Sequence, residues 1–174
     1  SVLSLPAVDR PDPVSIPRLT GEVGEAFVRE FLLQKLRPVE VAEERKKKTG
    51  VKVYNDPKLS GSKKNQVKVM RELLRRKMAV VRRRVLARVG TFAGWKKGGV
   101  SQRMIRDCRV ANLHLGDSDL VEVATGAAFS RLEPPGKGQV RIGRTDIQNA
   151  YFQVLLPEEL IELVGLFDCR AGDL

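Results

Sequence analysis

The sequence predicts an α+β fold, on three observations. Residues 65–89 repeat apolar side chains at steps of three and four, which is the spacing of an amphipathic helix. Residues 92–96 and 103–108 are short strand-like runs on either side of a glycine-containing turn, which favours a hairpin. With 174 residues and 42% hydrophobic side chains, the chain can bury a core and belongs to the globular class.

The elements before the long helix are predicted by prolines and by apolar spacing. The four prolines of residues 1–20 predict an extended arm. Residues 21–37 carry apolar side chains near helical spacing, and Pro38 follows them, which predicts a helix. Residues 43–64 are charged and rich in turn formers, which predicts a surface loop or linker with at most a short strand at 51–54.

Three further elements are expected after the basic helix over 65–89. A hairpin is expected around residues 92–109. Asp146 stands just ahead of an apolar and aromatic run, which predicts a strand over 145–154. Pro157 is followed by two glutamates and predicts a helix start, because proline fits the first turn and acids complement the helix dipole.

The positive charge is concentrated in the middle of the chain. Residues 41–110 hold 22 Lys and Arg against 5 Asp and Glu, a net charge of +17, whereas residues 1–40 carry −1 and residues 111–174 carry −5. The positive charges of such a segment either repel one another or bind a polyanion, and nucleic acid is the expected polyanion. The cations predicted to contact phosphates are Lys68, Arg71, Arg75, Arg76, Arg82 and Arg83. The alternative is a helix whose basic face contacts only solvent.

Composition also excludes or disfavours several classes of protein and site. No apolar run is long enough to span a bilayer, so no membrane partner is expected. Cys108 and Cys169 form no CxxC pair, which predicts free thiols in a reducing, intracellular compartment. His114 is the sole histidine, which excludes a His-rich zinc site and disfavours a Ser-His-Asp or Cys-His site.

Two motifs in a fixed order carry the most specific information. The first, "KKGGVSQRMIRDCRVAN", has two lysines and a glycine turn followed by the pattern R-x-x-x-D-x-R-x-x-N. The residues that fill this pattern are Arg103, Asp107, Arg109 and Asn112. The second, "DIQNAYFQVLLP", opens with Asp146 and continues with an alanine and two aromatic residues.

In this order the two motifs resemble the fingers hairpin and the first palm motif of reverse transcriptases. The resemblance covers about residues 92–174, and residues 1–91 show no comparable match. It implies partial reverse-transcriptase-like fingers and the start of a palm, preceded by a basic helical N-terminal region. The regions expected are a Pro-rich arm, helix and basic linker over 1–64, a basic helix and fingers-like hairpin region over 65–145, and the start of a truncated palm-like region over 146–174.

The resemblance also implies roles for particular residues. Asp146 is implied as the catalytic, metal-binding carboxylate, with the Ile147 carbonyl as a backbone ligand for Mg²⁺ in a complete active form. Asn149 and Ala150 are expected along the nucleotide triphosphate, and Tyr151 at the position of the steric gate. Lys96 and Arg103 are the expected fingertip cations that hold the triphosphate.

Bland alternatives stay open for these residues. Asp146 can be a strand-start residue that faces water, and Tyr151 can be a core aromatic. Lys97 can be a solvated charge at the turn. Asp107 and Arg109 can form an internal ion pair that orients the hairpin without contacting substrate.

Three functions follow from these observations. The first is a nucleic-acid-binding fragment of a reverse transcriptase, inactive as this chain alone, because the sequence reaches Leu174 without the Tyr-x-Asp-Asp turn that supplies the other metal carboxylates. The second is a domesticated retroelement remnant that serves as a basic structural subunit of a ribonucleoprotein assembly. The expected partners are RNA and, as the alternative, DNA. The third is a basic α+β domain with a partner other than nucleic acid.

Overall fold

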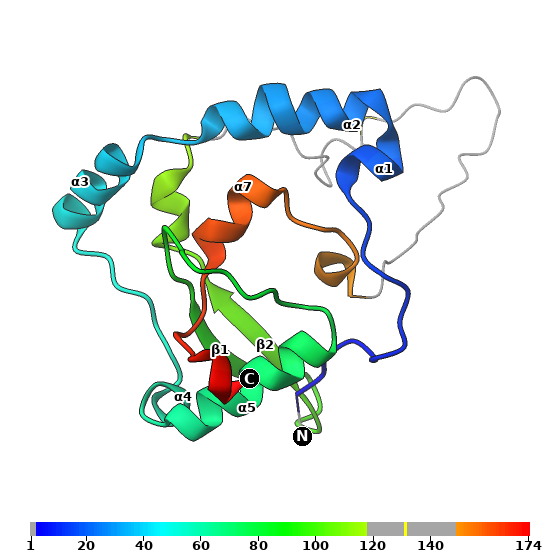
Figure 1. Ribbon diagram of the computed structural model, residues 1–174, viewed down its shortest axis with the longest axis vertical. Helices are drawn as coiled ribbons and strands as arrows, with labels where there is room; N and C mark the ends of the chain where they lie inside the picture. Colours follow the sequence, from blue (N-terminus) through cyan, green and yellow to red (C-terminus); the bar gives the residue numbers. More distant parts are fainter. Residues whose placement is uncertain (1–2, 118–130, 132–148) are drawn as a thin grey trace.

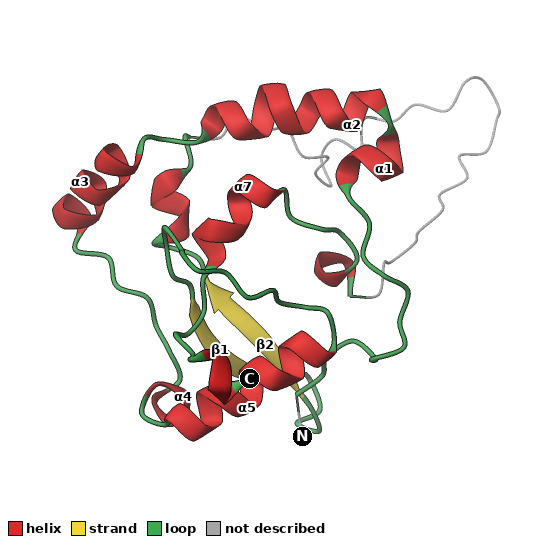
Figure 2. Ribbon diagram, viewed as in Figure 1, coloured by secondary structure: helices red, strands yellow, loops and turns green. Residues whose placement is uncertain are grey.

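The computed structural model describes residues 3–117, 131 and 149–174 of the chain. Within this part the fold is mixed α+β, with helices around a two-stranded antiparallel sheet (Figures 1 and 2). The prediction of an α+β fold is confirmed at this level. None of the helices in the described part is long and apolar enough to cross a lipid bilayer.

The elements of the described part have the following bounds. Before the sheet lie α1 (Ile16–Thr20), α2 (Glu22–Ala26), the π-helical turn η1 (Phe27–Leu32), the 3-10 turn η2 (Leu33–Lys35), α3 (Val39–Thr49), α4 (Pro57–Ser60) and α5 (Lys63–Arg75). The strands are β1 (Gly90–Trp95) and β2 (Gln102–Asp107). After them lie η3 (Ala111–His114), η4 (Ala150–Phe152), α7 (Glu158–Ile161), η5 (Glu162–Val164) and η6 (Ala171–Asp173).

The N-terminal region follows its prediction in outline. Residues 3–15 form an arm without helix, anchored by isolated parallel bridges to Gln102 and Val154. Consecutive helical turns then cover residues 16–35 along one side of the molecule (Figure 1). The extended arm predicted over 1–20 is wrong over residues 16–20, which form α1, a separate short helix that ends at Gly21 (φ 61°). The helix predicted over 21–37 is confirmed as the helical run over 22–35.

The loop or linker predicted over 43–64 is wrong where α3, α4 and the start of α5 lie, and it is confirmed over residues 50–56, which form a loop without a strand at 51–54. α3 has Glu40 in its first turn and Lys46 among the cations of its last turn, a distribution that complements the helix dipole. Gly50 ends the helix in the left-handed conformation (φ 61°) with its N–H bonded to the Lys46 carbonyl oxygen at 2.9 Å. Acidic residues ahead of basic residues are typical of a helix, but the high overall charge of this segment favoured the interpretation as a loop.

The helix predicted over 65–89 is correct only as far as Arg75, where α5 ends. Lys77 has a φ of 52°, and the Met78 N–H bonds back to the Leu73 carbonyl oxygen at 2.9 Å, as in a Schellman motif. A longer helix would hold several β-branched valines and three consecutive arginines without acids to compensate them. The apolar spacing continues past the helix end, so it overstates the length of the helix.

The hairpin predicted around 92–109 is confirmed. The register pairs Gly90 with Asp107 and Thr91 with Arg106. Paired residues of an antiparallel sheet point to the same face, and neighbours along a strand point to opposite faces. Thr91 and Arg106 therefore share one face of the hairpin, and Asp107 lies on the other.

The segment before α4 packs closely against β1. The Asp56 N–H donates to the Thr91 carbonyl oxygen at 3.0 Å, and the Thr91 N–H donates to the Asn55 side chain at 2.9 Å. A Cβ atom on Gly90 would lie 2.0 Å from the Tyr54 carbonyl oxygen. Only a glycine at this position allows the two backbones to come so close.

The main core forms where α7, η5 and η3 meet the chain that leads into β1. Its buried side chains are Ala87, Val89, Val110, Ala111, Leu160 and Leu163. Backbone hydrogen bonds join the Val89 N–H to the Gly165 carbonyl oxygen at 2.9 Å and the Gly165 N–H to the Ala87 carbonyl oxygen at 3.1 Å. The helix predicted to begin near Pro157 is confirmed as α7, and it carries apolar residues into this core.

The strand predicted over 145–154 is wrong in its described part. Residues 150–152 form the 3-10 turn η4, and Val154 makes only an isolated bridge. Asn149 precedes this turn in the left-handed conformation (φ 55°), which asparagine tolerates better than most residues and which interrupts a strand. Residues 145–148 lie outside the described part.

Candidate nucleic-acid interface

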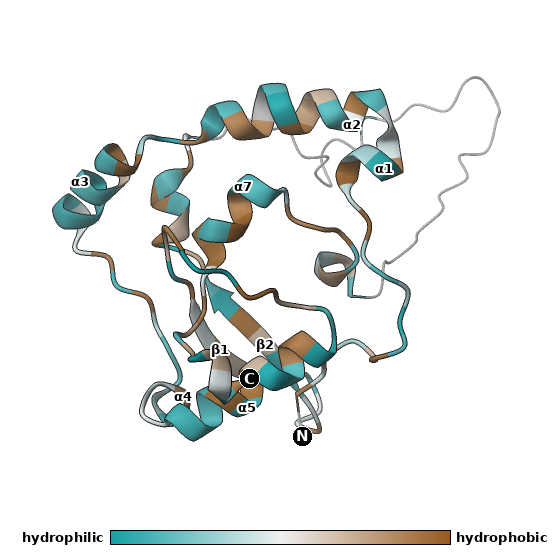
Figure 3. Ribbon diagram, in the orientation of Figure 1, coloured by the Kyte–Doolittle hydropathy of each residue, from teal (hydrophilic) through white to brown (hydrophobic). Residues whose placement is uncertain are grey.

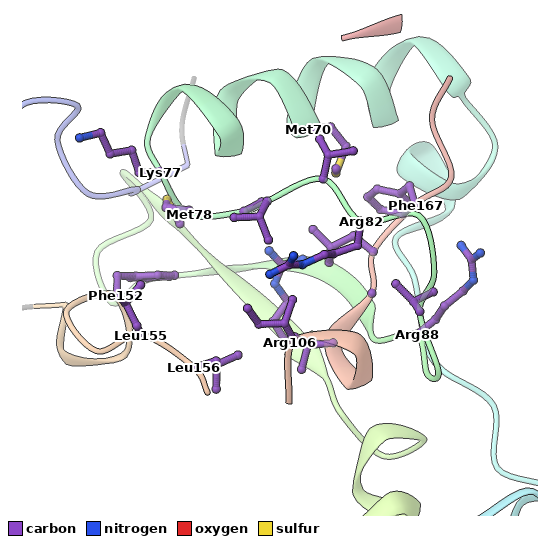
Figure 4. Close-up of a pocket in the computed structure, with 18 of the residues that line it drawn as sticks. Met70, Lys77, Met78, Arg82, Arg88, Arg106, Phe152, Leu155, Leu156 and Phe167 are labelled. Atoms are coloured by element: carbon purple, nitrogen blue, oxygen red, sulfur yellow. The ribbon is translucent and has the colours of Figure 1, made fainter. Parts of the chain in front are cut away.

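A cleft of about 790 Å³ opens between the segment that follows α5 and the residues around η4 and η5 (Figure 4). Residues 77–85 line one wall, residues from 151–156 line another, and residues 164–169 line a third. Arg106 reaches the cleft from β2 of the hairpin. Segments that are distant in the sequence therefore build the cleft together.

The charged side chains that line the cleft are almost all cationic. The lining cations of the described part are Arg10, Lys77, Arg82, Arg83, Arg84, Arg88 and Arg106. Asp168 is the one carboxylate among the described residues that line the cleft. A cleft lined with one sign of charge concentrates the field and attracts ligands of the opposite sign.

Three of these cations are paired with carboxylates from elsewhere in the chain. The pairs are Lys77–Asp12 and Arg88–Asp168, each 2.6 Å between charged atoms, and Arg82–Glu158. Hydrogen bonds from their cations lower the pKa of Asp12 and of Asp168. The three carboxylate side chains are between 69% and 86% exposed, so these are weak surface pairs in which a phosphate could replace the carboxylate.

Arg83 and Arg84 differ from these paired cations. Both are exposed, and no residue in the described ranges makes a hydrogen bond or an ion pair with either guanidinium. They follow one another on the same wall of the cleft. Two successive free guanidinium groups suit the regularly spaced phosphates of a nucleic-acid backbone.

Between its cations the cleft is lined largely by apolar side chains (Figure 4). Figure 3 shows that hydrophobic and hydrophilic residues alternate along the ribbon of α5, whose Met70 is one of the lining residues. The apolar lining includes Met70, Met78, Val81, Phe152, Leu155 and Phe167. Tyr151 also lines the cleft and is 97% exposed. Aromatic and apolar surfaces next to cations provide a place for bases to stack while the phosphates follow the charges.

Only Arg82 and Arg83 of the six predicted phosphate-contacting cations line the cleft. The other four lie on α5 or at its end: Lys68, Arg71, Arg75 and Arg76. The early end of α5 causes this division, because the chain leaves the helix axis before it reaches the second group of arginines.

The four cations of α5 are mostly engaged within the protein. Arg75 and Arg76 both bond to Glu72, at 2.8 and 2.6 Å, and these hydrogen bonds lower the pKa of Glu72 to about 2. The Arg71 Nε donates to a backbone carbonyl of η6 at 3.0 Å. Lys68 is exposed and has no partner in the described ranges. Among these four, Lys68 is thus the most available to an external phosphate.

The predicted fingertip cations lie on the hairpin, outside the cleft lining. Lys96 continues the ladder past β1 through its N–H, which donates to the Ser101 carbonyl oxygen at 2.8 Å, and its Nζ donates to the Ser4 hydroxyl at 2.6 Å. Arg103 is exposed and has no partner in the described part. The register places Lys96 and Arg103 on the same face of the hairpin. Lys97 is exposed at the turn, as its alternative predicted.

The alternative of an internal ion pair is confirmed for Asp107 and Arg109. The Arg109 Nε donates to Asp107 Oδ1 at 2.9 Å and Nη2 donates to Oδ2 at 2.7 Å. The Tyr54 N–H donates to the same carboxylate at 2.7 Å, and with Arg109 it holds the pKa of Asp107 well below its usual range. Asn112 lies in η3, beyond the end of β2.

The residues of the predicted palm motif are described only in part. Asn149 and Ala150 are exposed at the start of η4. The exposure of Tyr151 shows that its alternative as a core aromatic is wrong. Asp146 and Ile147 lie outside the described residues, so the expected Mg²⁺ site stays a prediction. Among the described residues, no group of three or more His, Cys, Asp or Glu side chains could hold a metal ion.

Sequence reasoning missed five of the seven cleft cations. These are Arg10, Lys77, Arg84, Arg88 and Arg106. Arg84 could have been predicted, because it directly follows Arg82 and Arg83 in a run of three arginines. Arg10 and Arg106 come from the arm and the sheet, so no local pattern places them beside that run.

Comparison of the chain with protein-family models, with curated proteins and with solved structures found no match. A function therefore has to be inferred from the cleft and from the sequence motifs.

Proposed function

We propose that this chain binds nucleic acid through the cationic cleft, with RNA as the expected ligand and DNA as the alternative. The observation that carries the proposal is a cleft whose described lining has seven cations and one carboxylate, and in which Arg83 and Arg84 have no partner among the described residues. Phosphates that bind such cations release condensed counterions, which drives association. The exposed carboxylates on the other cations are weak competitors for a polyanion.

The finer proposal is that the chain is the fingers and the start of the palm of a reverse transcriptase. The order of the two sequence motifs supports it, and so does the antiparallel hairpin with Lys96 and Arg103 on one face. In this role the two cations hold the triphosphate of an incoming nucleotide. Asp146 and Ile147 would hold Mg²⁺, which neutralises phosphate charge when bound.

The second candidate function is a retroelement remnant that acts as a structural RNA-binding subunit of a ribonucleoprotein. It is favoured by the origin of the cleft cations, because all of them except Arg106 precede residue 92, where the resemblance to reverse transcriptases begins. RNA binding by the cleft would then persist without any polymerase chemistry.

The shared part of the proposal is tested by RNA binding over a range of salt concentrations. Fluorescence anisotropy with a labelled single-stranded RNA should show an affinity that falls steeply as salt rises, because several Lys and Arg side chains replace counterions on the phosphates. Absence of binding at low salt would remove nucleic acid as the ligand.

A nucleotide-dependence experiment separates the two functions. If the chain is a reverse transcriptase portion, the complementary deoxynucleotide should make its complex with a primer–template more resistant to a salt challenge. Replacement of Lys96 and Arg103 by alanine should abolish that effect and leave RNA binding by the cleft intact. A complex that is indifferent to nucleotide, with RNA binding unaffected, favours the structural subunit.

A further inference from the structure

Arg106 carries a positive charge that no carboxylate compensates within the described part of the chain. Its Nη1 donates to the hydroxyl of Thr91 at 2.8 Å, and Thr91 is neutral and only 3% exposed. Cys108, which follows the end of β2, is a protonated thiol at neutral pH because burial raises its pKa. Asp107 points to the opposite face and is occupied by Arg109.

The Arg106 guanidinium stays charged in this setting. Burial lowers the pKa of Arg106 to about 10, which is still far above neutral pH. Arg106 is partly buried, so its charge carries a desolvation penalty that an anionic ligand would offset. The guanidinium has five N–H donors, and the hydrogen bond to Thr91 uses one of them.

Arg106 lines the cleft, as do Arg83 and Arg84, and Figure 4 draws its side chain among the lining residues. A planar guanidinium with free donors binds a phosphate through two parallel hydrogen bonds, and a lysine cannot reproduce this geometry. We propose that Arg106, held by Thr91, forms a phosphate-binding subsite inside the cleft. The subsite rests on the proposed nucleic-acid function and assigns one partly buried contact within it.

The direct test uses inorganic phosphate as the probe, with ionic strength held constant by exchange against chloride. In the wild-type chain, phosphate should shift the NMR resonance of the Arg106 Nε–H in a saturable manner and should raise the melting temperature. Arg106→Gln should weaken phosphate binding at least tenfold. Arg106→Lys keeps the charge and is expected to fold, yet it should still weaken binding several-fold because the planar fork is lost.

The matched control is Arg45→Gln, which removes the same charge from an exposed position on α3 that does not line the cleft. It should change phosphate affinity by less than twofold. An Arg106 resonance that does not move at saturating phosphate, or wild-type affinity in both Arg106 variants, would overturn the subsite.

RNAs of one sequence with a 5′-phosphate or a 5′-hydroxyl group identify the source of the phosphate. If Arg106→Gln weakens only the phosphorylated RNA, the subsite takes a terminal phosphate, and if it weakens both equally, the subsite takes an internal phosphodiester. Unchanged RNA affinity in this variant, without a phosphate effect, overturns the subsite and leaves the proposed function standing. Phosphate bound at Arg106 in a chain that does not bind RNA overturns only the function.

Discussion

Asp107, at the end of β2, accepts two hydrogen bonds from the guanidinium of Arg109, from Nε to Oδ1 at 2.9 Å and from Nη2 to Oδ2 at 2.7 Å. The same carboxylate accepts the Tyr54 N–H at 2.7 Å. One buried side chain therefore ties together β2, the chain that follows it and the segment that leads into α4. Its position explains how a motif that resembles a substrate-binding hairpin also stabilises the fold.

Asp107→Asn should lower the free energy of unfolding by about 1–3 kcal/mol, because hydrogen bonds to a charged group are lost. RNA affinity should stay the same, since neither Asp107 nor Arg109 lines the cleft. Urea unfolding and RNA anisotropy on the same preparation check both. Unchanged stability together with lost RNA binding would show that Asp107 contacts the ligand.

The same carboxylate predicts part of the acid sensitivity of the protein. Its pKa is lower in the folded chain than the unfolded value of about 4, so its contribution is fully present above pH 4 and is lost as the pH falls through the folded pKa. Urea unfolding below pH 4 should therefore show a shallower loss of stability in Asp107→Asn than in the wild type. Equal acid dependence in the two proteins would contradict this account.

Gly90→Ala should destabilise the chain by roughly 1–3 kcal/mol, because the new methyl group would overlap the Tyr54 carbonyl and force the two segments apart. The control is Gly172→Ala, where an added Cβ meets nothing within 4 Å. Thermal melts of the two variants should differ clearly. Equal melting temperatures would mean that the segment before α4 does not pack on β1.

His114 predicts a loss of stability in mildly acidic solution. The side chain is 3% exposed, and burial lowers its pKa below the unfolded value of about 6.5, with Glu43 opposing this shift and Lys46 adding to it. A group that is neutral in the folded state contributes stability above its unfolded pKa, and this contribution falls as protons bind the unfolded chain. The free energy of unfolding should therefore fall from pH 7.5 to pH 5, and less so in His114→Gln. An unchanged pH profile in that variant would contradict the expected role.

The sequence predicted the parts of the fold that local chemistry determines. The hairpin follows from alternating residues around a glycine turn, and α7 follows from Pro157 and the acids behind it. The end of α5 was not predicted, because Lys77 adopts a positive φ that normally selects glycine. Apolar residues beyond that point keep helical spacing, but Val89 packs in the core whereas Val81 is 61% exposed.

The candidate site was predicted less completely than the fold. The excess of cations in residues 41–110 indicated a polyanion, and the run after α5 supplied Arg82 and Arg83. Glu72 neutralises cations that looked free in the sequence, since its partners follow it by three and four residues on one helix. Arg106 faces the cleft because of the sheet register, which tertiary structure sets.

The central claim is that the cleft binds the nucleic-acid backbone through its unpaired arginines, and a matched pair of double variants tests it most directly. The measurement is the slope of the logarithm of RNA affinity against the logarithm of salt concentration for Arg83→Gln/Arg84→Gln and for Arg18→Gln/Arg45→Gln. Both variants lose two exposed charges, but only the first loses them from the cleft. The cleft variant should bind more weakly and lose about 1.4 from the magnitude of the slope, roughly 0.7 for each phosphate contact, whereas the control should keep the wild-type slope. Equal slopes in the two variants would show that the cleft is not where the nucleic acid binds.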